Sequence, residues 1–223
     1  MKKIALLMLL LAACTTPAQT NSTNTTALSN TTLRIMLDEF AKIDTELNTS
    51  WHEEEIPRKL IPPTAIEPWT QKLIALKNST EPDSFPDKLV EARLNMLKSQ
   101  AAYYLGAEIG AAGALVMKGE EGKFTVTEKI NCERLPSITK ATQYYAHSFA
   151  HWLKFVHHMD DLLQKSDEAK ELIGTNLARP KFYTPSFADA AGKINATATA
   201  VKQQCGYDIA LPKEAIYDAR PSM

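Results

Sequence analysis

The stretch SITKATQYYAHSFAHWLKFVHHMDDLLQ, residues 137–164, decides the fold expected of this chain. It contains no proline or glycine, and its apolar residues recur every three or four positions, as they do on one face of an α-helix. At 100° per residue, a stripe within about 60° of Ile138 collects the residues expected to face a core, which are Ala141, Thr142, Tyr145, Phe149, Trp152, Leu153, Val156, Met159 and Leu163. The spacing therefore predicts a long helix that packs against other helices.

Three histidines, His147, His151 and His158, fall on the side of this helix opposite the predicted core. Two histidines four residues apart on a helix can bind one metal ion, and imidazole suits zinc, copper and nickel. This predicts a surface metal site of His147 and His151, completed by His158 or by a second molecule. The alternatives are a solvated helix face, because Lys154 on that face would repel a cation, and a contact surface that gains charge near the ordinary histidine pKa of about 6.5.

A second long helix is predicted over DKLVEARLNMLKSQAAYYLGAEIGAAGALVM, residues 87–117, after Pro86 in a first turn that tolerates proline. Its apolar residues spread over about half of its circumference, which is typical of a central helix. Small residues around Gly106 and Gly110 could suggest a membrane helix, but Glu108 near their middle would be costly in lipid. We therefore expect these small residues to let a neighbouring helix pack closely, with Glu108 at the boundary of the core.

The remaining segments predict two further helices and a connector. Residues 31–47 have the apolar spacing of an amphipathic helix, and residues 186–205 begin with a capping-box pattern and end before Gly206. Five prolines between residues 51 and 85 predict a connector with one short helix over residues 69–77, and a short helix is also expected after Ser166. Residues 124–127 alternate in polarity and could form a short strand.

Two of the three cysteines, Cys132 and Cys205, are predicted to form a disulfide. If residues 137–164 and 186–204 form antiparallel neighbouring helices, the start of the first lies beside the end of the second, which brings the two cysteines together. An even pair of cysteines in an exported domain indicates a disulfide, and the alternative is two separate buried thiols. The expected fold class is thus all-α, an antiparallel bundle of four to five helices with one disulfide and a proline-rich connector.

The first 14 residues, MKKIALLMLLLAAC, have the order of an export signal, with two lysines before an apolar run too short to span a bilayer. Their end, Leu11-Ala12-Ala13-Cys14, resembles the lipobox of prokaryotic lipoproteins. The resemblance covers residues 1–14 only. It implies that residues 1–13 are removed, that Cys14 carries a diacylglyceryl group and an acyl chain such as palmitate, and that the chain is anchored to an envelope membrane without spanning it. The alternative is ordinary signal-peptide cleavage nearby.

The domain organisation follows from these segments. Residues 1–13 are the predicted signal peptide, and residues 14–30 are the lipidated cysteine with a disordered tether rich in threonine and asparagine. Residues 31–206 are the predicted helical domain, and residues 207–223 are a tail in which a short helix is allowed. Sequons for N-glycosylation occur at Asn21, Asn24, Asn30, Asn48, Asn78 and Asn195. Together with the lipobox they suggest an archaeal cell surface, which both lipidates and N-glycosylates, and the alternative is a bacterial envelope.

Charge and motifs narrow the function. The chain has 25 basic and 26 acidic residues, so losing Lys2 and Lys3 with the signal would leave a formal net charge of −3. No basic run with interleaved aromatic residues appears, so we expect no nucleic-acid partner. No motif for a catalytic or cofactor site appears, so we expect neither an enzyme nor a cofactor. The expected function is a non-catalytic lipoprotein that binds another envelope protein, and the alternative is metal handling through the three histidines.

Overall fold

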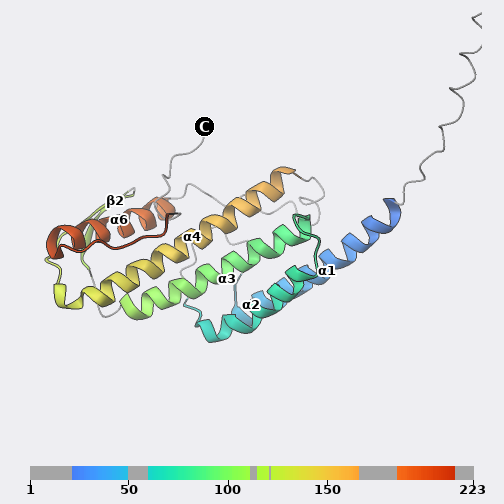
Figure 1. Cartoon of the computed structure of the whole chain (residues 1–223), viewed down its shortest axis with the longest axis horizontal. Helices are drawn as coiled ribbons and strands as arrows, with labels where there is room; N and C mark the ends of the chain where they lie inside the picture. Colours follow the sequence, from blue (N-terminus) through green and yellow to red (C-terminus); the bar gives the residue numbers. More distant parts are fainter. Residues whose placement is uncertain (1–21, 50–59, 111–114, 121, 166–184, 214–223) are drawn as a thin grey trace, which may run out of the picture.

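The computed structural model describes residues 22–49, 60–110, 115–120, 122–165 and 185–213, and this part of the chain is mostly helical (Figure 1). Its elements are α1 (Ser22–Leu47), α2 (Pro63–Asn78), α3 (Phe85–Gly110), β1 (Met117–Glu120), β2 (Lys123–Val126), a 3-10 turn (Cys132–Arg134), α4 (Leu135–Lys165) and α6 (Pro185–Cys205). The predicted helical class is therefore confirmed. The short helix predicted after Ser166 lies outside the described residues.

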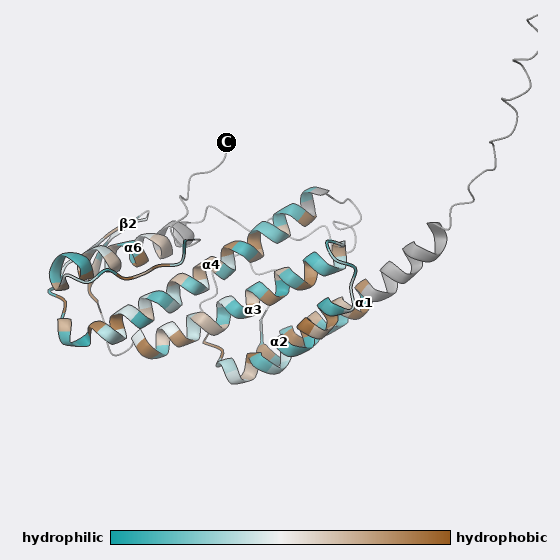
Figure 2. Ribbon diagram, viewed as in Figure 1, coloured by the Kyte–Doolittle hydropathy of each residue, from teal (hydrophilic) through white to brown (hydrophobic). Residues whose placement is uncertain are grey.

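Helix α3 is the central element, as its sequence predicts. It packs against α1, α2 and α4, and Leu89, Met96 and Leu97 on it are fully buried. It runs antiparallel to α4, because Lys88 lies near Asp161 at one end of the pair and Gly110 lies near Ala141 at the other. Along α1 to α4, polar and apolar segments alternate in Figure 2, which is the pattern of helices that bury one side and expose another.

Helix α4 is buried over a wider arc than its sequence predicts. The predicted stripe is confirmed for residues such as Phe149, Val156 and Met159, which are almost inaccessible to solvent. Ala146 and Phe155 lie outside that stripe but are equally buried. The physical reason is that α4 packs against both α3 and α6, so two neighbours cover adjoining parts of its surface.

Several predicted boundaries are wrong. Helix α3 ends at Gly110, and Met117, predicted as its last residue, begins β1 instead. The alternation at residues 124–127 allows either a short strand or extended chain, and the structure has strand β2 there. Its partner β1 is not predicted; the two strands pair antiparallel, with Met117 opposite Val126. The backbone N–H and C=O groups of β1 therefore form hydrogen bonds with β2, in place of the hydrogen bonds within a longer α3 helix that the sequence predicts.

The first helix also begins earlier than predicted. Helix α1 starts at Ser22, so residues 22–30, expected to be part of a disordered tether, are helical. Extending an existing helix costs far less than starting one, so the segment packed around Met36 and Phe40 can support polar turns before it. The connector holds α2, which is 16 residues long and begins at Pro63 rather than at Trp69.

Helix α6 ends as its sequence predicts, and the predicted disulfide is confirmed. Gly206 has φ +67, a conformation that glycine adopts easily and that terminates the helix. Cys132 and Cys205 are bonded, with their Cα atoms 5.7 Å apart. Beside them, the side chain of Gln204 accepts a hydrogen bond from the backbone N–H of Ile130 at 2.8 Å. The end of α6 therefore lies at the start of α4.

Within the ranges that the structure describes, none of the helices combines the length and the apolar character needed to cross a membrane.

Candidate functional site

The three histidines of α4 do not share one environment. His147 is exposed, as predicted, but His151 and His158 are only partly exposed and lie against α3. Nδ1 of His151 is 3.1 Å from Oδ1 of Asn95, and Nε2 of His158 is 3.8 Å from Oε1 of Glu91. The prediction that all three point away from the helical core is therefore wrong for His151 and His158, because α3 covers the edge of α4 on which they stand.

Glu91 connects His158 to a third helix. Its Oε2 accepts a hydrogen bond from Nζ of Lys77 on α2 at 2.8 Å. This hydrogen bond lowers the pKa of Glu91 and raises that of Lys77 from their ordinary values. Partial burial lowers the pKa of His158, and the nearby Glu91 carboxylate opposes that effect. At neutral pH the pair Lys77 and Glu91 is charged, and His158 beside it is neutral.

Asp87 completes the polar corner where α2, α3 and α4 meet. It is buried, and its carboxylate accepts hydrogen bonds from the hydroxyl of Thr80 at 3.3 Å and from the backbone N–H of Asp83 at 3.1 Å. Nζ of Lys77 lies 3.9 Å from its Oδ1. Asp87 thus holds the turn between α2 and α3 in place.

The metal site stays a prediction. Across the described ranges, no three side chains from histidine, cysteine, aspartate and glutamate come together as a ligand set. Nδ1 of His151 lies against Oδ1 of Asn95, and His147 stands one turn away with Lys154 exposed on the same face. Glu108, predicted at the boundary of the core, is exposed on α3.

Small residues allow close contact between α3 and α4, as predicted. The hydroxyl of Ser99 donates to the carbonyl of Ser148, and the hydroxyl of Ser148 donates to the carbonyl of Ser99, both at 2.8 Å. A Cβ atom added at Gly106 would lie 3.0 Å from the ring of Tyr145. These contacts set the register that brings His151 to Asn95.

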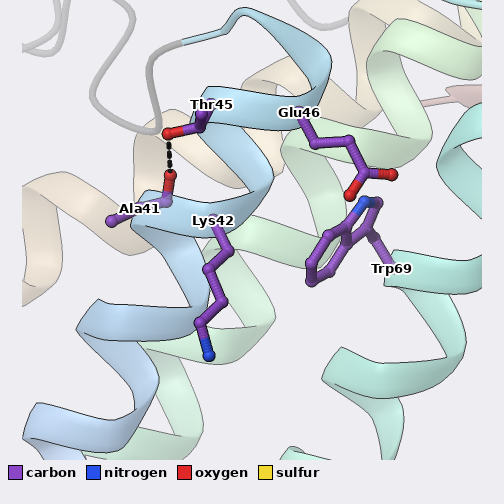
Figure 3. A pocket seen from close by; sticks show the side chains of 5 residues that line it. All are labelled: Ala41, Lys42, Thr45, Glu46 and Trp69. Carbon is purple, nitrogen blue, oxygen red and sulfur yellow. Dashed lines mark hydrogen bonds between the residues drawn. The ribbon is translucent and has the colours of Figure 1, made fainter.

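An open groove lies between α1 and α2, with a volume of about 460 Å³ (Figure 3). Its lining consists of Ala41, Lys42, Thr45, Glu46 and Trp69. Beside it, Nζ of Lys72 stands 5.0 Å from the centre of the Trp69 ring and forms an ion pair with Glu39. Lys42 also pairs with Glu39, and the hydrogen bonds from both lysines lower the pKa of that carboxyl. The groove thus combines an aromatic side chain with charged residues at its edge, a surface suited to contact with another molecule.

The other predicted sites are scattered. Asn48 and Asn78 are exposed near the ends of α1 and α2, and Asn195 is exposed on α6. Asn24 and Asn30 fall within α1. Asn21 and the predicted lipidation site Cys14 lie outside the described residues.

The partners of the two half-buried histidines, His151 and His158, were missed in the sequence. Asn95 and Glu91 are four residues apart on α3 and so lie on the same side of that helix, a spacing visible in the sequence. The sequence does not show the register between α3 and α4. Without that register, His151 cannot be paired with Asn95, nor His158 with Glu91. No family model matches the chain, and no characterised protein or solved structure matches it either.

Proposed function

We propose that this chain is a lipid-anchored envelope protein whose helical domain has a non-catalytic binding role. The observation that carries the proposal is the use of its three cysteines. The disulfide takes Cys132 and Cys205, and the remaining cysteine, Cys14, stands directly after the apolar run of an export signal. A disulfide is favoured outside the cytoplasm, and a cysteine at that position is the one that lipoproteins acylate.

The proposed arrangement is an antiparallel bundle of α1 to α4 and α6, held close to its membrane. Only residues 15–21 separate Cys14 from the first residue of α1. Seven residues span at most about 25 Å, so the domain would stay within one domain diameter of the lipid surface. Partners in reach are therefore other envelope components, and the groove beside Trp69 is a surface that they could contact.

The test is lipidation of the full chain in a bacterial host, compared with Cys14→Ser. We expect the parent chain to enter the detergent phase on detergent partitioning, and its amino-terminal peptide to have the mass of a diacylglyceryl cysteine. The Cys14→Ser variant should lose both properties while keeping the disulfide between Cys132 and Cys205. A parent chain that is cleaved elsewhere and carries no lipid would contradict the proposal.

A further inference from the structure

The middle of the α3–α4 pair contains no acidic residue on either helix. The acid-free segments are residues 92–107 of α3 and residues 140–159 of α4. The hydrogen bonds between Ser99 and Ser148 place the two segments side by side. We call them together the acid-free zone. Its charge is positive, although the chain as a whole has a formal net charge of −1.

Three exposed lysines place this positive charge at the surface of the protein. Lys140 and Lys154 are exposed on α4 and stand 14 residues apart, close to four full turns, so they share one stripe of the helix. Lys98 is exposed on α3, about one turn beyond Asn95. Because Asn95 contacts His151, Lys98 lies at the edge of α3 that borders this side of α4. The three lysines therefore face one side of the molecule.

On α3 and α4 themselves, the other charged residues within or next to the two segments are buried or lie at the ends of the acid-free zone. Arg93, the other basic residue of the two segments apart from histidine, is buried and paired with Asp44 on α1 at 2.5 Å. Glu91, just before the zone, is bound by Lys77. Asp160 and Asp161 follow the α4 segment, and Oδ2 of Asp161 lies 3.9 Å from Nζ of Lys88. Glu108 follows the α3 segment and is exposed at the other end of the zone. The zone is thus bordered at one end by acidic residues, of which Glu91 and Asp161 have basic partners, and at the other end by Glu108.

We propose that the acid-free zone is the side of the domain that contacts an anionic membrane, with lipid phosphates bound by Lys98, Lys140 and Lys154. This inference rests on the proposed lipid anchor, which would bring the domain to that surface. Three lysines near an anionic bilayer strengthen a contact by about a hundredfold. That is weak for a free protein, but an anchored domain meets the membrane at a high effective concentration, so the contact can orient it.

The test uses the chain from residue 14 to residue 223, which keeps every described element. With the other two cysteines in the disulfide, the thiol of Cys14 is coupled to a maleimide lipid in vesicles of phosphatidylcholine, with or without phosphatidylglycerol. The rate at which each lysine is acetylated is then measured by mass spectrometry. Chemical coupling replaces natural lipidation, so this test can fail while lipidation of Cys14 succeeds, and the reverse.

We expect Lys98, Lys140 and Lys154 to react several times more slowly on the phosphatidylglycerol vesicles than on neutral ones, and molar salt to remove the difference. Lys118 and Lys129, exposed in and after the hairpin, should react equally on both and serve as internal controls. In Lys140→Glu/Lys154→Glu, protection of Lys98 should disappear, whereas Lys118→Glu/Lys129→Glu, with the same change of charge, should keep it. Equal rates for Lys98, Lys140 and Lys154 on both kinds of vesicle, or protection of the control lysines instead, would overturn the proposal.

Discussion

At the scale of single residues, His158 shows how a partner on another helix controls a side chain. Partial burial between α3 and α4 lowers its pKa, and Glu91 at 3.8 Å partly offsets that effect. In the unfolded chain, His158 would have the ordinary histidine pKa of about 6.5, whereas in the folded chain its pKa is lower. Protonation of His158 therefore favours unfolding.

We predict that His158→Gln makes the stability of the protein less sensitive to acid. In the parent chain, the free energy of unfolding should fall as pH decreases from about 6.5 through the lower pKa of folded His158, because the unfolded state binds more protons in that window. Urea unfolding at a series of pH values measures the slope. In Glu91→Gln, the His158 pKa, followed by NMR, should drop further; a rise would contradict the assigned roles.

At the scale of elements, the contact between α3 and α4 depends on small residues at defined positions. Gly106 is buried, and a Cβ atom there would lie 3.0 Å from two ring carbons of Tyr145. The ring has little room to retreat, since Tyr145 also contacts Tyr103, with their ring centroids 5.7 Å apart. At Gly110, an added Cβ would lie at an ordinary 3.5 Å from Ala141.

We predict that Gly106→Ala destabilises the protein by about 1 kcal/mol, because overpacking outweighs the gain in helix propensity. Gly110→Ala, the matched control, should leave the free energy of unfolding unchanged or raise it by up to about 1 kcal/mol, because the gain in helix propensity meets no clash there. Urea unfolding of the two variants measures the difference. If Gly106→Ala were more stable than the parent, the close contact with Tyr145 would not limit the packing of these helices.

At the scale of the whole molecule, the disulfide joins parts of the chain that are distant in sequence. Cys132 and Cys205 are 73 residues apart, and they fasten the end of α6 to the start of α4. Buried contacts in the same region come from a second apolar cluster of Ile130, Ile138, Ala200, Val201 and Ile209. The disulfide and this small cluster together hold α6 in place.

We predict that Cys132→Ser/Cys205→Ser lowers the free energy of unfolding by about 4 kcal/mol, the value for closing a loop of this length in the unfolded chain. Chemical denaturation under oxidising conditions measures it. Cys14→Ser should leave the free energy of unfolding unchanged, since that residue takes no part in the disulfide. A loss of less than about 1 kcal/mol would mean that the apolar contacts alone hold α6.

Sequence reasoning succeeded where a local pattern is sufficient. The apolar stripe of residues 137–164, the glycine after Cys205 and the small residues around Gly106 each predict a feature that the structure has. It failed where a feature depends on a distant segment. The strand Met117–Glu120 needs its partner β2, and the first turns of α1 need the packed helix that follows them.

The sequence by itself determined which residues share a face of each helix, where α6 stops and which cysteines could pair, because these properties follow from periodicity and local chemistry. Only the tertiary structure decided what covers each face. His151 and His158 stand on the side of α4 that appears polar in the sequence, but α3 approaches there and provides Asn95 and Glu91. The reason is that periodicity defines directions around one helix, whereas the neighbour in each direction is set by the packing of the whole chain.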